Sequence, residues 1–497
     1  MWSLLKKDPR TILRKIIVGK TVKKDENLKK TKNLDLIKRV IKQGLSGCKS
    51  LAEMYREIAT FLVNIGQPEL AQRYYKLSLE LDYTPATYSL YLQCLLLSPS
   101  CSDQEMFLKA TQYNQFFSDI KKSESLPLSP VIKDKKLNIG YICHFFHNSV
   151  SPSLLLPFIR AHNRERVKIF CYSDTESFEV PENIKNIADT WRDTKNLDDD
   201  QLTTVIRQDK IDVLLELNGH CVTNRYGVIA RRAAPIQISY YNINATTGIS
   251  EMDYILVGDE ICLDQSRDYY TEKFYYLKGV TSIAEFPTTF PKCSPPPSLH
   301  TTDVTFGSFG AAHKVNYQVI KVWCKILKQV PHAKFYMKAG VLTHDNYLQA
   351  YKRSFAAEGV DLSRIHLEGF SDHLAMLDCY AKIDIALDTF PHTGGTTTVE
   401  ALWQGVPVIT WSGDRYAWKH GKMILTSVGH PELVAYSEEE YIAKAVELAN
   451  SKERLLNYRN QLRADFKNSP KADVKAFATK LEDAYYDMWK NYEEYPL

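Results

Sequence analysis

From Lys136 onward the sequence repeats one pattern, in which a short run rich in β-branched and aromatic residues precedes an amphipathic stretch. This alternation predicts βα units, whose strands lie parallel in a sheet covered by helices. The runs fall into two sets, and two α/β domains in tandem are therefore expected. The first set is KLNIGYIC, VKIFCYSD, IDVLLELNG, PIQISYYN and DYILVGDEIC; the second is VTFGSFGAA, AKFYMKAG, RIHLEGF, IDIALDTF and VPVITWSG.

A polar stretch with five prolines, FPTTFPKCSPPPSLHTTD, separates the two sets and is typical of an interdomain connection. We therefore expect one domain at residues 136–290, a second at 301–470, and a closing amphipathic helix within 471–497. In open α/β sheets, ligands bind outside the carboxyl ends of the strands. The cleft between the two domains is the expected site.

The chain ahead of these domains has a different periodicity. Apolar positions at three- and four-residue spacing predict an all-α domain at residues 1–125. Within it, residues 52–85 resemble a single 34-residue tetratricopeptide (TPR) repeat. The repeat's aromatic and small positions are occupied by Tyr55, Ala59, Gly66, Ala71, Tyr75 and Ser78. One repeat cannot form a solenoid, so these helices must pack on another part of the chain.

Charge and cysteine content narrow the function classes. Residues 1–42 hold fourteen Lys/Arg against four Asp/Glu, so the remainder of a chain with net charge +4 is acidic, unlike a nucleic-acid-binding surface. The basic segment suits an anionic membrane or nucleic acid, although a solvated helix and loop is the simpler interpretation. No run approaches 18 apolar residues, no secretory h-region opens the chain, and the ten cysteines contain no CxxC pair. We expect a cytoplasmic protein without a membrane span.

The stretch LDTFPHTGGTTTVEALWQGVPVITW combines bare backbone with hydroxyl groups. Its expected elements are a strand at Ile383–Asp388, a turn at Gly394 and Gly395, and a helix at Thr396–Gln404 that Gly405 ends. Free N–H groups at a helix start, beside hydroxyls, form an anion site that commonly holds diphosphate. The structural alternative is a capping box, because Thr397 and Glu400 have its spacing. The stretch is neither a P-loop nor GxGxxG.

The same stretch, with SGD added at its end, resembles the nucleotide-sugar site of glycosyltransferase family 41, which contains O-GlcNAc transferases and bacterial adhesin N-glycosyltransferases. The resemblance extends over most of residues 136–489. It implies a GT-B fold, in which two Rossmann-like parallel-sheet domains face a cleft, here preceded by the all-α TPR-like domain. Further matching stretches are NIGYICHFFHNS, LNGHCVTNRYGVIARRAAPIQISYYNINATTGISEMDYILVGDE, YTEKFYYL and FGSFGAAHKVN.

The resemblance implies specific roles for residues of the second domain. Lys314 falls on the lysine that contacts the donor diphosphate, and Glu400 on the acidic residue that holds the ribose hydroxyls. His373 resembles a bacterial-type histidine near the nucleotide, and Gly395 stands where animal members have a histidine. The full expected donor-binding set is Lys314, His373, Gly394, Gly395, Thr396, Thr397 and Glu400, with Thr396 and Thr397 on the phosphate-contacting threonines.

The expected catalytic residues are Lys314, His147 and His220. The family's histidine near the sugar is least secure, because the chain is one residue shorter there; His147, His144 or Asn148 could take its place. His220, in LNGHCVTNR at the carboxyl end of a strand, resembles a family histidine, and a hydrogen-bonded structural histidine is the alternative.

A competing motif lies in NLDDDQL, where Asp198 to Asp200 contain the DxD pattern of metal-dependent GT-A glycosyltransferases. These residues open a predicted helix, and acidic side chains suit a helix start through capping and the helix dipole. We therefore expect no metal and no cofactor beyond the donor substrate. Backbone amides, threonine hydroxyls and Lys314 would stabilise the leaving diphosphate instead.

The resemblance implies an inverting transferase that moves a sugar, with GlcNAc from UDP-GlcNAc to Ser/Thr of a protein or peptide acceptor as the leading hypothesis, although nothing in these residues fixes the sugar. Three alternatives stay open: hexose transfer from UDP-Glc to Asn or another acceptor, action on a small molecule or lipid, and a non-catalytic TPR/GT-B binding protein. Met376 and Lys278 favour the last, because the family has a polar donor and a proline there. Nucleic acid is not an expected partner, and the oligomeric state is not predicted.

Overall fold

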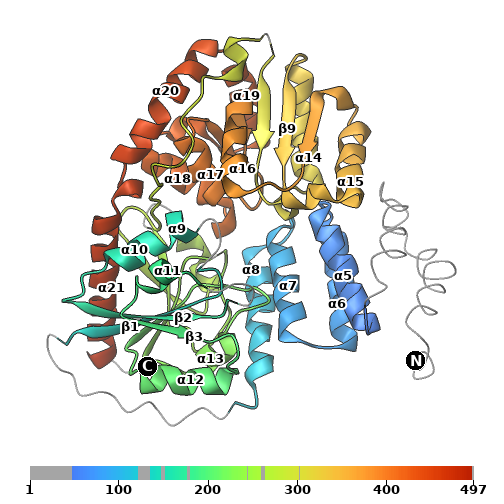
Figure 1. The fold of residues 1–497 in the computed structure, drawn as a ribbon. Coiled ribbons are helices and arrows are strands. Elements are labelled where there is room, and N and C mark those ends of the chain that lie inside the picture. The colour runs from blue at the N-terminus through green and yellow to red at the C-terminus, as the bar shows by residue number, and fades with distance from the viewer. Residues whose placement is uncertain are drawn as a thin grey trace, which may run out of the picture.

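Two parallel sheets and a group of N-terminal helices make up the computed structural model (Figure 1). It describes residues 48–120, 135–146, 151–175, 180–242, 244–258, 264–301 and 303–494. The basic segment at residues 1–42 lies outside the described residues. In Figure 1 the first sheet lies at the lower left, the second at the top, and the blue N-terminal helices below the second sheet. This confirms the predicted GT-B arrangement with a helical region ahead of it.

The first sheet has the strand order β3-β2-β1-β4-β5-β6-β7, and every neighbouring pair is parallel. The chain runs outward from β1 to β3 and then returns to β4, so the direction of winding reverses between β1 and β4. The strands are β1 (Leu137–Cys143), β2 (Val167–Ser173), β3 (Thr190–Asp193), β4 (Val213–Glu216), β5 (Ile236–Ser239), β6 (Tyr254–Gly258) and β7 (Lys273–Leu277); the helices are α9 (Ser151–Leu154), α10 (Leu156–Ala161), α11 (Glu182–Lys185), α12 (Asp199–Gln208) and α13 (Tyr226–Ala230).

The second sheet repeats this topology with the order β10-β9-β8-β11-β12-β13, and its winding reverses between β8 and β11. Ligands of such sheets bind at this reversal, outside the carboxyl ends of the strands. The strands are β8 (Thr305–Ser308), β9 (Lys334–Lys338), β10 (Ile365–Glu368), β11 (Ile385–Leu387), β12 (Val408–Trp411) and β13 (Val434–Ala435); the helices are α14 (Tyr317–Gln329), α15 (Asp345–Ala357), α16 (His373–Asp378), α17 (Thr396–Trp403), α18 (His420–Val428), α19 (Glu438–Ala449) and α20 (Lys452–Asn468).

Three strands lack the apolar runs by which the other ten were predicted. Strands β3, β7 and β13 lie at sheet edges, where only one side pairs. An edge strand need not be buried on both faces, and most residues of β3 and β7 are indeed partly or fully exposed. Strand β13 is buried but has only two residues, too few to form a recognisable pattern.

The N-terminal helices share a hydrophobic core with the first sheet. Their elements are α5 (Leu51–Asn64), α6 (Pro68–Leu81), α7 (Pro85–Leu96), α8 (Asp103–Thr111) and the 3₁₀ helix η2 (Gln112–Phe117). Ala59 and Ala71 are fully buried, so the first two helices approach closely, and Leu92 joins a cluster with Tyr172 and Leu214 of the sheet domain. A single repeat is too short to bury its own hydrophobic surface, and here the first sheet domain covers that surface.

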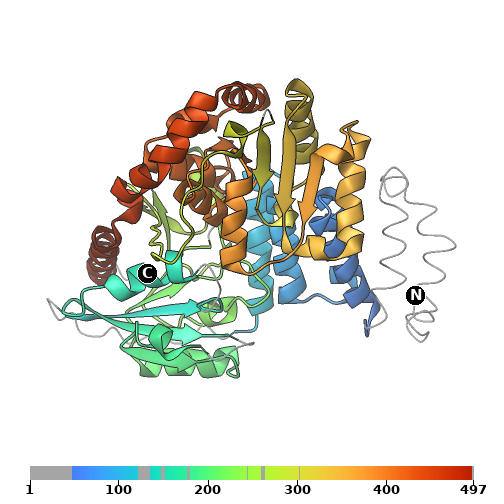
Figure 2. The ribbon, with the colours of Figure 1, turned by 45° about the horizontal axis from the view of Figure 1, so that its top comes forward.

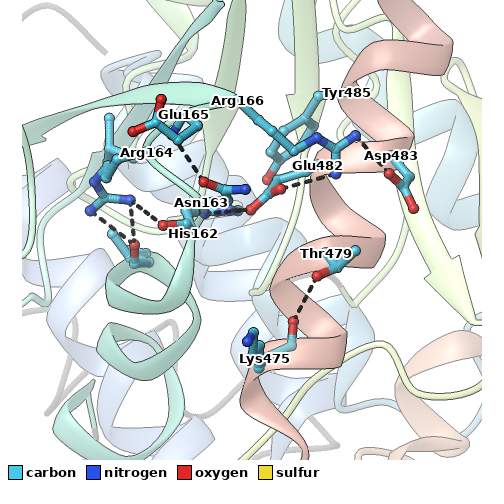
Figure 3. A network of polar contacts seen from close by, with 12 residues as sticks. His162, Asn163, Arg164, Glu165, Arg166, Lys475, Thr479, Glu482, Asp483 and Tyr485 are labelled. Atoms are coloured by element: carbon cyan, nitrogen blue, oxygen red, sulfur yellow. Dashed lines mark hydrogen bonds and ion pairs between the residues drawn. The ribbon is translucent and has the colours of Figure 1, made fainter.

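The last helix, α21 (Val474–Glu494), returns from the second domain to pack on the first; Figures 1 and 2 show it along the outer side of the molecule. Its buried Glu482 accepts hydrogen bonds from the backbone N–H of Asn163 at 2.8 Å and from Arg166 at 3.1 Å (Figure 3). Glu482 also contacts His162 Nδ1 at 3.1 Å, and His162 Nε2 lies 2.7 Å from the hydroxyl of Tyr141. This network ties the C-terminal helix to the first domain.

Candidate active site

The turn between β11 and α17 is fixed by one buried carboxylate, Asp388. Its Oδ1 accepts hydrogen bonds from the backbone N–H of Gly394 at 2.7 Å and of Thr389 at 2.8 Å, and its Oδ2 accepts one from Thr410 at 2.7 Å. A Cβ at Gly394 would lie 2.6 Å from Thr398 Oγ1, so only glycine fits there. The Gly394 amide, expected as a phosphate donor, is therefore engaged inside the turn.

The next three amides form the start of α17. Gly395 is the N-cap and makes no side-chain cap, so the alternative of a capping box is wrong. Among the hydrogen bonds of the described residues, the backbone N–H groups of Gly395, Thr396 and Thr397 have no acceptor. These groups carry the positive end of the helix dipole and suit an anion. A Cβ at Gly395 would meet nothing within 4 Å, so this position has room for a side chain.

Lys314 reaches the same turn from the other side of the winding reversal. It ends the short 3₁₀ helix η5 (Ala312–Lys314) after β8, and its Nζ donates to the backbone oxygen of Thr393 at 3.1 Å. Burial lowers the pKa of Lys314 to about 8, against the opposing effect of Asp388. Lys314, Gly395, Thr396 and Thr397 line one hollow of about 710 Å³. One ammonium and a helix N-terminus therefore converge on it.

Glu400 lies one turn further along α17 and is 2% exposed. Its Oε1 lies 2.7 Å from Nε2 of His373, the first residue of α16, whereas its Oε2 is buried with no hydrogen-bond partner among the described residues. Burial raises the pKa of Glu400, and His373 partly offsets this. A buried acceptor without a donor is costly, and a ligand hydroxyl would satisfy it.

Of the histidines expected near the sugar, His147 lies outside the described residues, as does Asn148. His144 follows β1, and its Nδ1 lies 2.8 Å from Oδ1 of Asn218. His147 and Asn148 therefore stay predictions. The side chain of His144 is held in place by its contact with Asn218.

His220 follows β4, and its Nε2 lies 2.7 Å from the backbone oxygen of Thr247. Its ring packs edge-on against Tyr113 and Tyr226, and burial lowers its pKa to about 4. Its buried Nδ1 has no partner within the described part of the chain. His220 lines a separate, smaller hollow and is not among the residues around Lys314. These contacts are those of a hydrogen-bonded structural histidine, the alternative that the sequence left open for His220.

Two histidines that share a hollow with Lys314, His392 and His420, had no role predicted from the sequence. A second hollow, of about 960 Å³, lies between the two sheet domains. Its wall includes Tyr241, Asn242 and Asn244 from the first domain and Lys314, His392, Gly395, Thr396 and His420 from the second. His392 lies in the stretch LDTFPHTGGTTT, three residues before Gly395, and this position was its only signal in the sequence.

The Asp198–Asp200 motif caps a helix, as the structural interpretation predicted. Asp198 Oδ1 accepts from the backbone N–H of Gln201 at 2.8 Å in a capping box, and Asp199 pairs with Arg225 at 3.1 Å. Asp200 pairs with Arg231. In the described residues, no group of three or more His, Cys, Asp or Glu side chains is arranged to hold a metal ion.

Known proteins with similar sequences and structures identify the family of this chain. The family model described as Glycosyl transferase family 41 matches residues 120–295 and 297–481. The chain belongs to glycosyl transferase family 41. The SPINDLY protein of Hordeum vulgare, described as a probable UDP-N-acetylglucosamine–peptide N-acetylglucosaminyltransferase, is 31% identical over 404 residues, which cover 79% of this chain and 42% of that protein. The SEC protein of Arabidopsis thaliana, described in the same words, is 30% identical over 368 residues, covering 71% and 37%.

The solved structure of a mutant O-GlcNAc transferase from Thermobaculum terrenum resembles this family 41 chain, with a TM-score of 0.83 and 29% identity over 91% of this chain and 87% of that one. The chain spans about two-fifths of the length of the curated relatives named above. None of the helices in the described part of the chain combines the length and apolar character that a bilayer crossing requires.

Proposed function

We propose that this chain transfers N-acetylglucosamine from UDP-GlcNAc to Ser/Thr of a protein acceptor in the cytoplasm, with inversion at the anomeric carbon. The observation that carries the proposal is the convergence of Lys314 and the free amides of Gly395 to Thr397 on one hollow, with the unpaired oxygen of Glu400 in the same helix. The descriptions of the relatives as UDP-N-acetylglucosamine–peptide N-acetylglucosaminyltransferases and O-GlcNAc transferases support the choice of donor and acceptor.

The arrangement supplies the chemistry that the reaction needs. In the transfer, the acceptor oxygen forms a bond to the anomeric carbon while the bond from that carbon to the diphosphate breaks, and negative charge grows on the leaving group. Preorganised donors aimed at this charge lower the barrier, as a metal ion would. Lys314 and the α17 amides act as these donors, and the Glu400 carboxylate orients the nucleotide through its ribose hydroxyls. The account needs no metal ion.

The acceptor is expected to approach between the helical region and the sheet domains. The helical region reaches both of them. Gly66 O accepts a hydrogen bond from the N–H of Tyr317 in the second domain at 3.1 Å, and Ser89 Oγ accepts one from Asn224 in the first domain at 3.0 Å. A groove of about 1020 Å³ there is lined by helical residues, including Thr60 and Asn64. A groove between stacked helices and a cleft suits an extended polypeptide.

The test is to incubate the purified chain with a panel of UDP-, GDP- and dTDP-sugars and with host proteins, measuring nucleotide release and acceptor mass. The Lys314→Met variant serves as the matched control. We expect UDP release and HexNAc addition at Ser/Thr, lost in the variant. Hexose on asparagine, or transfer from another nucleotide sugar, would correct the donor or linkage. No release with any donor and acceptor would support a non-catalytic binding protein instead.

A further inference from the structure

The hollow between the sheet domains and the groove beneath the helical region share part of their walls. Four residues line both: Asn242 and Asn244 from the first domain, and Lys314 and His392 from the second. The hollow also contains Gly395 and Thr396 of the anion site, whereas the groove continues along Thr60, Asn64 and Gln93 of the helical region. His392 therefore lies where a donor held by its diphosphate would meet an acceptor lying in the groove.

The backbone around His392 is held in place. Its carbonyl oxygen accepts a hydrogen bond from Thr389 Oγ1 at 2.7 Å, and the next carbonyl, of Thr393, accepts from Lys314 Nζ at 3.1 Å. The His392 ring centre lies 6.0 Å from that of His420. This fixed backbone keeps the imidazole close to the lysine that faces the diphosphate.

Burial and nearby positive charges keep the His392 imidazole neutral. Burial holds its pKa well below the usual range, and Lys314 and Arg415, with His420 and His313 when these are protonated, lower it further. The acidic group nearby is Asp388, which acts on Lys314 and belongs to the turn itself. A neutral imidazole with a free lone pair is the form that accepts a proton.

We propose that His392 is the general base of the transfer and removes the proton of the acceptor hydroxyl. As the acceptor oxygen bonds to the anomeric carbon and the diphosphate leaves with the bonding electrons, that proton passes to the His392 ring. This assignment rests on the proposed function. It also couples the two substrates, because a bound diphosphate offsets the charge of Lys314 and thereby makes His392 a stronger base. The base thus gains strength only when the donor is in place.

The experiment compares His392→Gln with wild type in UDP binding by calorimetry and in the pH profile of kcat. A general base contributes roughly 100- to 10,000-fold, so we expect kcat to fall at least about 100-fold while the KM for the donor changes by less than about threefold. The wild-type kcat should fall at acidic pH as the base is protonated, and this limb should vanish in the variant. His313→Gln, altering the groove alone, and His420→Gln, altering the hollow alone, should keep the acidic limb.

A kcat within about threefold of wild type, or an unchanged acidic limb in His392→Gln, would overturn the assignment. If His392→Gln fails to bind UDP, then His392→Gly with added imidazole decides: recovered turnover supports the base, and none overturns it. An active wild type with an unaffected His392→Gln would refute only this assignment. A wild type inert with every donor would refute the proposed function as well.

Discussion

Replacing Lys314 by methionine removes the ammonium group but keeps a side chain of similar length and an apolar stem. At an effective dielectric constant of about 20, two unit charges about 4 Å apart attract each other by about 4 kcal/mol. Loss of one donor to a developing oxyanion costs about 2.7 to 4 kcal/mol, or roughly 100- to 1000-fold in kcat. Since Lys314 lies half-buried beside Thr393 and Asp388, we expect a loss within this range.

The assay is steady-state UDP release over a range of pH, with Lys314→Arg as the matched variant. The pKa of Lys314 in the free chain is about 8, so wild-type kcat/KM should fall above that pH as the ammonium loses its proton. Arginine stays protonated, so Lys314→Arg should retain part of the activity and lose this alkaline limb. Near-wild-type turnover in folded Lys314→Met, or an alkaline limb that persists in Lys314→Arg, would refute the reasoning.

Three further outcomes follow from the geometry. Glu400→Gln should weaken UDP binding by about 10-fold or more, the effect of one charged hydrogen bond, yet leave 2′,3′-dideoxy-UDP unaffected in calorimetry; equal losses for both ligands would contradict the ribose contact. Gly66→Ala should reduce both the free energy of unfolding and the affinity for UDP, because Gly66 has a φ of +76° and a Cβ there would lie 2.5 Å from the backbone oxygen of Val315, beside Lys314. Gly359 has a similar φ of +75° but open space around it, so Gly359→Ala is the matched control. In urea unfolding this control should show only the backbone cost of about 1–3 kcal/mol. Activity should persist in excess EDTA, and a loss restored by manganese would refute the metal-free account.

The parts of the fold that the sequence predicted are those in which one physical requirement acts over several neighbouring residues. Strands buried on both faces need continuous apolar runs, so β1 and β6 were recognisable. The start of α17 at Thr396 was also predictable, since the glycine turn before it and Gly405 after it, at φ +74°, mark both ends. Edge strands lack such a requirement, and three of the four, β3, β7 and β13, were missed.

The contacts that decide the site join residues distant in the chain, and no local pattern reports them. Lys314 donates a hydrogen bond to the backbone oxygen of Thr393, which lies 79 positions later in the chain. Asp388 was predicted only as the end of a strand, and yet its carboxylate accepts a hydrogen bond from the backbone N–H of Gly394. His392 is a candidate only because it lines both the second hollow and the groove beneath the helical region, which are formed by distant parts of the chain. Local sequence signals therefore located the anion site at the start of α17, and tertiary contacts determine which of its N–H groups are free to bind an anion.

The most direct test of the account is a crystal structure of the chain with UDP bound. We predict the diphosphate within hydrogen-bonding distance of Lys314 Nζ and the amides of Gly395 to Thr397, with the ribose hydroxyls on Glu400 Oε2. A diphosphate bound away from both Lys314 and the start of α17, or held by a metal ion, would contradict it.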